Sequence, residues 1–162
     1  NSPVKYVQTE QSLQESLKNS PKLTDEEVEY EKSQRTTRAS VFSRKIKKIY
    51  NDTCAICGAR RYSPEGNPEV EAAHIYPKEE NGADDFRNGL ALCKLHHWAF
   101  DSGWLSLTDD LRIIVKTDTE VETPNSFESL EGEQISVPSD PDLKPHEAFI
   151  KAHRELYGFD ET

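Results

Sequence analysis

Methionine is absent from this 162-residue sequence, cysteine occurs only three times, and hydrophobic residues make up 34% of the chain. Because translation normally begins with methionine, we expect the chain to be a fragment, an excised domain or a processed product. No apolar run approaches the roughly 20 residues needed to cross a membrane. The amino terminus also lacks the pattern of a signal peptide. These absences argue against membrane and secreted proteins and predict a cytoplasmic protein with no membrane partner.

The low hydrophobic content predicts a small core, and small cores usually need disulfides or a metal ion for stability. Three cysteines do not form the even framework typical of secreted domains. The pairs Cys54-x-x-Cys57 and Cys93-x-x-His96 instead have the spacing of two zinc knuckles, and Zn²⁺ takes four sulfur or nitrogen ligands in a tetrahedron. We therefore expect one structural Zn²⁺ held by Cys54, Cys57, Cys93 and His96. Three unpaired buried thiols, or a redox-active C-x-x-C pair, are the less favoured alternatives.

Negative charge predominates in the sequence, with a net charge of −10. From Ser33 to Arg61, however, eight basic residues stand against one acidic residue, whereas Asp101 to Thr162 holds fifteen acidic and five basic residues. This asymmetry predicts a basic face that binds DNA and an acidic tail. Taken alone, it fits a solvated helix beside a solvated tail equally well. The candidate DNA-binding residues are Arg35, Arg38, Arg44, Lys45, Lys47 and Lys48.

Periodicity and turn-forming residues divide the chain into three parts. Residues 1–33 are expected to form a polar arm and a helix, and residues 34–117 a basic helix followed by the chemical motifs. Residues 118–162 are expected to form an acidic extension with a final helix. The predicted helices cover residues 24–32, 39–50, 94–102 and 145–157, and the predicted strands cover residues 70–75, 90–92, 104–107, 111–116 and 135–137.

Three motifs follow one another between Val70 and Leu107. They are Ala72-Ala73-His74-Ile75-Tyr76-Pro77, Asn88-Gly89-Leu90-Ala91-Leu92 and His97-Trp98-Ala99-Phe100-Asp101. They predict a strand ending at His74, a turn at Asn88-Gly89, a second strand, and a helix that carries His97. In this order the motifs resemble the HNH (ββα-metal) endonucleases, in the branch found in bacterial restriction enzymes. The resemblance implies an α+β fold: a ββα-metal core with a structural zinc knuckle, flanking helices and a small C-terminal β/α extension.

The resemblance also implies a role for each motif. His74 is the general base, Asn88 orients His74 through the ring nitrogen that is not used for catalysis, and His97 binds a catalytic Mg²⁺ or Mn²⁺. Asp101 lies four residues beyond His97, so a helix places both on one face, and we add Asp101 as a second metal ligand. A histidine base and a divalent cation together meet the needs of phosphodiester hydrolysis.

One departure from the family pattern concerns the residue before the base. Many HNH enzymes have an acidic or histidine metal ligand there, whereas this sequence has Ala73, so we expect fewer protein ligands for the metal. Glu71 is nearby, but strand alternation points it to the face opposite His74. We therefore rank Glu71 low as a ligand.

The function that these observations predict is metal-dependent DNA hydrolysis by the nuclease domain of a restriction or phage-defence enzyme. The expected partners are DNA, an upstream module that recognises DNA or a modified base, and a second copy of the chain in a homodimer. Two alternatives remain open. One is a catalytically inactive, zinc-stapled DNA-binding module, and the other is a protein-interaction domain that acts through the acidic tail.

Overall fold

The computed structural model describes residues 3–25 and 32–160. The helices are α1 (Pro3–Glu15), α2 (Lys32–Ile49), α3 (Lys94–Asp101), α4 (Asn125–Glu128) and α5 (Glu147–Tyr157), and the strands are β1 (Glu71–His74), β2 (Gly89–Leu92), β3 (Leu105–Leu107) and β4 (Ile113–Val115). Four short 3-10 helices are η1 (Ser16–Lys18), η2 (Lys78–Glu80), η3 (Phe86–Asn88) and η4 (Pro141–Leu143). In these described ranges, every helix is too short or too polar to cross a membrane.

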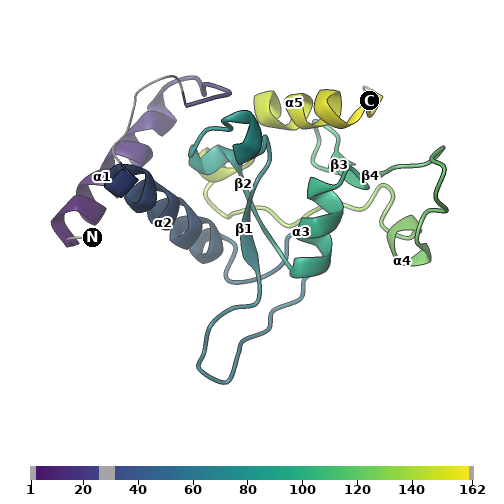
Figure 1. Ribbon diagram of the computed structural model, residues 1–162, viewed down its shortest axis with the longest axis horizontal. Coiled ribbons are helices and arrows are strands. Elements are labelled where there is room, and N and C mark those ends of the chain that lie inside the picture. Colours follow the sequence, from purple (N-terminus) through teal and green to yellow (C-terminus); the bar gives the residue numbers. More distant parts are fainter. Residues whose placement is uncertain (1–2, 26–31, 161–162) are drawn as a thin grey trace.

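A two-stranded antiparallel sheet forms the centre of the molecule. In this sheet Glu71 of β1 lies opposite Leu92 of β2, and His74 lies opposite Gly89. Figure 1 shows α2 on one side of the two strands and α3 on the other. The strand–strand–helix order β1, β2, α3 is the expected ββα core, so the predicted fold class is confirmed.

Helix α2 packs closely on the sheet through one apolar face. Val41, Phe42 and Ile46 are buried at helical spacing. A side chain on Gly89 would not fit beneath this helix, because an added Cβ would lie 2.3 Å from Ile46 Cδ1. Gly89 itself is extended, with φ −129°, and begins β2. The expected turn at residues 88–89 is therefore wrong: here glycine serves close packing and not a turn.

A second small sheet packs against α3, and α5 packs against this sheet. Strands β3 and β4 pair antiparallel, as predicted, and α5 packs against β3. His153 of α5 is buried; its Nδ1 shares a hydrogen bond of 2.7 Å with Ser106 Oγ, and its ring stacks on Phe100. Burial lowers the pKa of His153 to about 4, so this histidine is a neutral structural residue.

The final helix ends as the sequence predicts, whereas the strand expected at residues 135–137 is absent from the described chain. Gly158 closes α5 in a left-handed conformation, with φ 72°, which glycine adopts without strain. In place of the strand, Gln134 forms one isolated bridge with Arg112. The expected acidic extension also contains the short helix α4.

The amino-terminal part of the chain is more ordered than a polar arm. Helix α1 crosses α2 and packs against it (Figure 1). The helix predicted for residues 24–32 falls largely on residues 26–31, which lie outside the described residues. Thr24 itself forms an isolated bridge with Gly82, so Thr24 lies against the loop that follows β1.

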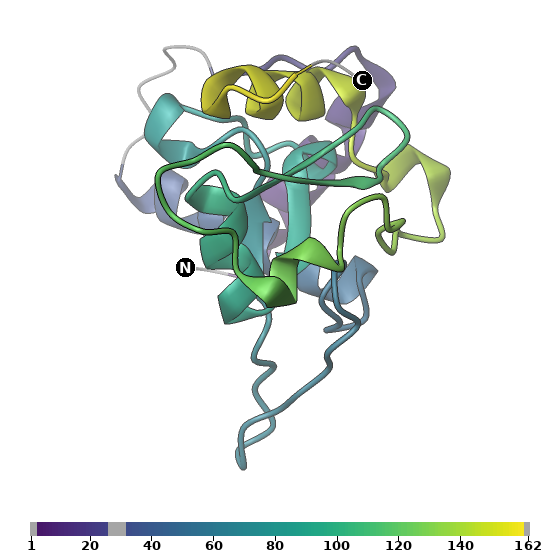
Figure 2. The same ribbon diagram turned by 90° about the vertical axis from the view of Figure 1, so that its right-hand side faces the viewer.

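A narrow projection leaves the body of the molecule between α2 and β1. We call residues 58–69 the finger; Figure 2 shows it extending away from the rest of the fold. Tyr62 and Pro68 form a bridge across it, and Arg61 pairs with Glu69 at 2.7 Å. These two contacts hold the two sides of the finger together.

Candidate active site and metal centre

Four side chains that can bind a metal converge at the amino-terminal end of α3. The ligand atoms of Cys54, Cys57, Cys93 and His96 all lie within 4.8 Å of one another. Cys93 Sγ is 3.3 Å from His96 Nδ1, and Cys57 Sγ is 3.9 Å from Cys93 Sγ. Tetrahedral zinc–sulfur bonds of about 2.3 Å place neighbouring ligands roughly 3.5 to 3.8 Å apart. The cluster therefore has the chemistry and the spacing to hold one zinc ion.

This ligand cluster ties two separate segments together. Cys54 and Cys57 lie in the loop after α2, while Cys93 directly follows β2 and caps α3. A backbone hydrogen bond from Ala55 to Ala91 holds the two segments side by side. Burial lowers the pKa of His96, which favours the neutral ring that metals bind.

His97, the next residue of α3, lies between two carboxylates. Its Nδ1 is 2.9 Å from Glu71 Oε1, and its Nε2 is 3.0 Å from Asp101 Oδ2. The hydrogen bond with Asp101, aided by Glu71, raises the pKa of His97 to about 9. A ring nitrogen and carboxylate oxygens are also ligands that suit Mg²⁺ or Mn²⁺. The carboxylates of Asp101 and Glu71 that stabilise the proton on His97 could equally stabilise a divalent cation in its place.

The position of Glu71 differs from the sequence expectation. Strand alternation correctly places Glu71 and His74 on opposite faces of β1, because His74 stacks on Phe42 of α2 while Glu71 contacts His97 of α3. The low rank of Glu71 rested only on its position opposite His74. Because α3 covers the other face, Glu71 contacts the candidate metal-binding histidine.

His74 is held by a ring on one side and a carboxylate on another. Its ring stacks on Phe42 with centroids 4.1 Å apart, and its Nε2 is 2.9 Å from Asp84 Oδ1. The His74 side chain keeps 18% of its surface exposed, against 4% for Asp84. The His74 side chain is thus partly accessible to solvent, while the Asp84 side chain is buried.

Asp84 is a residue that the sequence did not single out. Burial raises the pKa of its carboxyl group, but the hydrogen bond from His74 and the positive charge of Lys78 outweigh burial and bring the pKa below its usual value. Asp84 Oδ2 is 3.1 Å from Lys78 Nζ and 3.7 Å from Arg38 Nε. In sequence, Asp84 is one acidic residue in a polar loop, and nothing in that pattern distinguishes it.

Asn88 does not contact His74 in the way that the resemblance implies. Its Oδ1 accepts a hydrogen bond from the Tyr76 backbone N–H at 2.8 Å, and its Nδ2 donates to the carbonyl oxygens of Tyr76 and Ala83. The predicted direct hydrogen bond to the His74 ring is therefore corrected. Asn88 instead closes the loop between residues 76 and 83, and so braces the segments next to His74 and Asp84.

The two histidine sites share a strand but do not touch. Helix α3 runs beside β1: Lys94 N donates to Glu69 Oε2 at one end, and Asp101 O accepts from Tyr157 Oη at the other. Lys94 Nζ also lies 3.9 Å from Glu71 Oε2. Because the amino-terminal end of α3 contacts Glu69 and Glu71, Asp101 at its carboxyl end lies toward the His74 end of β1, and Glu71 lies toward the other.

The candidate DNA-binding residues lie on α2 but differ in surroundings. The guanidinium of Arg38 is enclosed by Asp25 and Asp84, so this residue stands apart from the others. Arg44 and Lys45 lie over aromatic rings of Tyr6 and Phe86. A surface groove runs between the carboxyl end of α2 and the finger, and its lining consists of Arg44, Lys47, Lys48, Asn51, Asp52, Asn67 and Pro68.

Comparisons with known proteins relate part of this chain to one family. The family described as HNH endonuclease matches residues 54–108. A solved structure titled "Modification dependent TagI restriction endonuclease" superposes with a TM-score of 0.53 at 26% sequence identity. The match covers 71% of this chain and 36% of that one, so the chain spans about a third of that protein's length. The comparison with curated proteins finds no match. The matched segment, which contains the zinc-type cluster, β1, β2 and α3, is therefore similar to the HNH endonucleases.

Proposed function

We propose that this protein is a metal-dependent DNA endonuclease in which His74 is the general base. One observation carries the proposal: within the family-matched segment, β1 and α3 present His97 between Glu71 and Asp101, with His74 on the same strand. This arrangement offers both a proton acceptor and ligands for a divalent cation, as phosphodiester hydrolysis requires.

The residues of this chain divide that work. His97 and Asp101 would hold Mg²⁺ or Mn²⁺, and the bound cation supplies positive charge to the scissile phosphate and the leaving oxygen. His74 accepts a proton from the attacking water at a ring nitrogen. Cys54, Cys57, Cys93 and His96 would hold a structural Zn²⁺ that fixes the start of α3, and therefore the position of His97.

The groove beside α2 supports DNA as the substrate. Arg44, Lys47 and Lys48 line it together with the finger, and clustered basic residues bind nucleic-acid phosphates with little dependence on sequence. We infer that the target is chosen by another part of a longer protein, such as a module that reads modified bases. The TagI structure, titled as modification dependent, is similar over only part of its length, which fits a nuclease domain of a restriction or phage-defence enzyme.

The proposal is tested by plasmid cleavage with the zinc-loaded protein. We expect nicking or linearisation only when Mg²⁺ or Mn²⁺ is added, and we expect His74→Ala to lose about 10²- to 10⁴-fold in rate, the usual contribution of a general base. DNA binding by His74→Ala should persist. Cleavage by His74→Ala at the wild-type rate would contradict the proposed mechanism. DNA binding without any cleavage by the wild-type protein would favour the zinc-stapled binding module.

A further inference from the structure

We propose that Asp84 is the positioning residue of the catalytic base, and that the amino-terminal segment through Asp25 holds Asp84 in place. The inference rests on the proposed function, in which His74 accepts the proton of water. It adds which ring nitrogen does so, and it assigns a role in catalysis to two acidic residues outside the family motifs.

The first step is the hydrogen bond between the two side chains. Asp84 Oδ1 lies 2.9 Å from His74 Nε2. An ionised carboxylate only accepts hydrogen bonds, so Nε2 must carry the proton that it shares with Asp84. The other nitrogen, Nδ1, makes no hydrogen bond within residues 3–25 and 32–160, and it is not among the buried atoms without a partner in those ranges. Nδ1 therefore keeps its lone pair and remains open to solvent.

The second step is the environment that keeps Asp84 ionised and immobile. Its side chain is only 4% exposed, and its second oxygen faces Lys78 and Arg38. Two cations on one side and a histidine N–H on the other satisfy both oxygens of the carboxylate. A buried charge in such a setting has little freedom to rotate, so it imposes one orientation on the His74 ring.

The third step links this pair to the amino-terminal segment. Asp25 Oδ2 accepts a hydrogen bond from the Asp84 backbone N–H at 3.0 Å. The same carboxylate pairs with Arg38 at 3.4 Å and with Lys78 at 3.6 Å. Asp25 and Asp84 thus share two cations. Backbone hydrogen bonds from Ala83 to Leu23 and from Asp25 to Asn81 lay residues 23–25 along the loop.

The fourth step is the brace at the base of the loop. Asn88 bonds the backbone of Tyr76 and of Ala83, and these residues stand two positions after His74 and one position before Asp84. Asn88 therefore fixes the distance between the ends of the loop. The family asparagine acts here on the His74–Asp84 pair through the backbone.

The chemical consequence is a choice of tautomer. In the hydrolytic step an O–H bond of water breaks and its proton goes to His74 Nδ1. The water oxygen forms a bond to phosphorus, and the bond from phosphorus to the leaving oxygen breaks with its electron pair. With Nε2 protonated against Asp84, only Nδ1 has a lone pair for this proton. The opposite tautomer would leave the solvent-facing nitrogen without one.

The decisive measurement is the tautomer of His74 in the full chain. Long-range ¹H–¹⁵N NMR of ¹⁵N-histidine-labelled protein distinguishes a protonated from an unprotonated ring nitrogen, and His74→Gln identifies the signals. We expect Nε2 to carry the proton and Nδ1 to be unprotonated in the neutral ring. A neutral His74 with its proton on Nδ1 would overturn the proposal, whether or not the protein cleaves DNA.

A variant provides the second test. In Asp84→Asn the amide oxygen should face Lys78 and Arg38, which turns the NH₂ group toward His74 Nε2 and forces the proton to Nδ1. We expect the tautomer to switch and cleavage to fall about 10²-fold or more, while the zinc content stays unchanged. Glu79→Gln, an exposed change in the same loop, should alter neither the tautomer of His74 nor the cleavage rate.

The outcomes separate this inference from the proposed function. Wild-type cleavage by Asp84→Asn, or an unchanged His74 tautomer in that variant, would refute the role of Asp84 while leaving the nuclease intact. Failure of the wild-type protein to cleave would refute the function, and the wild-type tautomer would still test whether Asp84 orients the ring. If Asp84→Asn does not fold, the wild-type spectrum alone decides.

Discussion

The zinc-type cluster and the candidate metal-binding group meet at His96 and His97, two neighbouring residues of α3, yet the two groups are built differently. Cys54, Cys57, Cys93 and His96 form a closed set whose ligand atoms all lie within 4.8 Å of one another. His97 begins the second group, in which contacts reach outward to Glu71 and Asp101. His74 lies apart from it and is held by Asp84.

This difference teaches how one short helix serves two purposes. Successive residues of an α-helix point about 100° apart, so His96 faces the buried cluster while His97 faces β1. The closed set offers four protein ligands, which is the number that a structural zinc site uses. The other group keeps partly exposed side chains, with 25% of His97 and 49% of Asp101 accessible, which would leave a phosphate room to approach under the proposed function.

The largest expected effect separates the two adjacent histidines. His96→Ala should reduce zinc content, lower the melting temperature strongly and abolish cleavage as a consequence, because structural zinc contributes directly to folding. His97→Ala should retain one zinc per chain and near-normal stability, yet lose metal-dependent cleavage. Elemental analysis, thermal melting and plasmid nicking on both variants measure the difference. Zinc loss in His97→Ala with zinc retention in His96→Ala would reverse the assignment.

A second change should disturb the loop that carries Asp84 and leave the zinc-type cluster intact. An added Cβ on Gly82 would lie 1.8 Å from the Tyr76 carbonyl oxygen and 2.8 Å from that of Pro77. Because these are backbone atoms, Gly82→Ala must displace the loop that carries Asp84, at a cost of about 1 to 3 kcal/mol or more. We expect at least about 10-fold slower cleavage with full zinc content.

The control for this change is the preceding residue. Asn81 has a left-handed backbone, with φ 60°, which glycine adopts freely. Asn81→Gly should therefore leave cleavage near the wild-type rate. Equal rates for Gly82→Ala and the wild type would show that the loop geometry does not matter for catalysis.

A third, smaller effect concerns DNA binding and leaves both clusters intact. Replacing Arg44, Lys47 and Lys48 by glutamine should weaken binding to all sequences alike. It should reduce the slope of log affinity against log salt by about 2 to 3, because each phosphate contact contributes about 0.9. A slope equal to that of the wild type would show that the groove beside α2 does not contact DNA.

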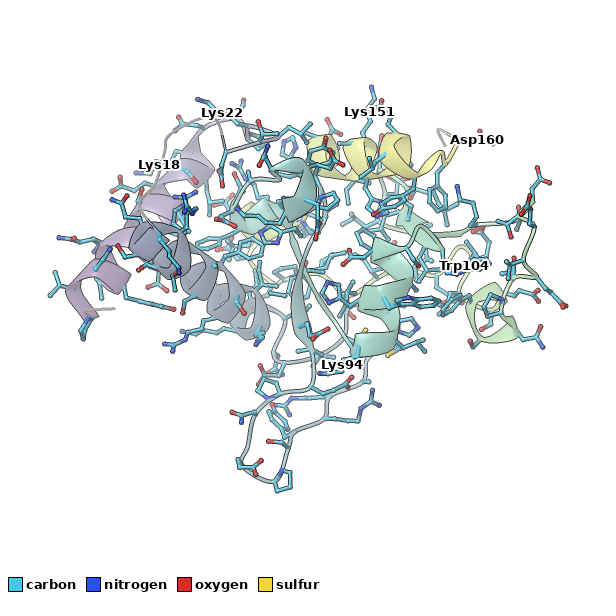
Figure 3. All side chains as sticks on the ribbon, viewed as in Figure 1. Lys18, Lys22, Lys94, Trp104, Lys151 and Asp160 are labelled. Carbon is cyan, nitrogen blue, oxygen red and sulfur yellow. The ribbon has the colours of Figure 1, made fainter. Side chains whose placement is uncertain are left out.

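The matched control removes the same charge elsewhere. Lys18, Lys22 and Lys144 are exposed, and Figure 3 shows Lys18 and Lys22 at the edge of the molecule opposite the finger. Their replacement by glutamine changes the net charge by the same amount. The slope should stay near the wild-type value, which separates local contact from general electrostatic attraction.

The smallest effect is expected at Glu71. Glu71 contacts Nδ1 of His97 and Asp101 contacts Nε2. The ring can therefore bind a cation through the lone pair of one nitrogen while the N–H of the other donates a hydrogen bond to a carboxylate. Asp101 lies toward the His74 end, so Glu71 should be the residue that orients the ring. Glu71→Gln should then weaken Mn²⁺ binding about 10-fold, and Asp101→Asn should weaken it more. Calorimetric titration of zinc-loaded variants measures this, and the opposite order would exchange the two roles.

The local patterns of the sequence were sufficient for much of this site. The paired C-x-x-C and C-x-x-H spacings predicted the zinc-type cluster, because knuckle geometry depends on residues three positions apart along the chain. The interval between His97 and Asp101 predicted their contact at 3.0 Å, since a helix brings residues four apart together. The order strand, strand, helix also followed from short-range periodicity, although Gly89 was misread as a turn.

Contacts between distant segments could not be predicted in the same way. Strand alternation correctly separated Glu71 from His74, but only the packing of α3 on the Glu71 face brings Glu71 to His97. In the sequence Asp84 is indistinguishable from other acidic loop residues, whereas in the structure it is buried between His74, Lys78 and Arg38. The sequence alone therefore determined the motifs whose geometry is set within one helical turn or one knuckle. The tertiary structure decided which charges are buried together, because burial depends on segments that meet only when the chain has folded.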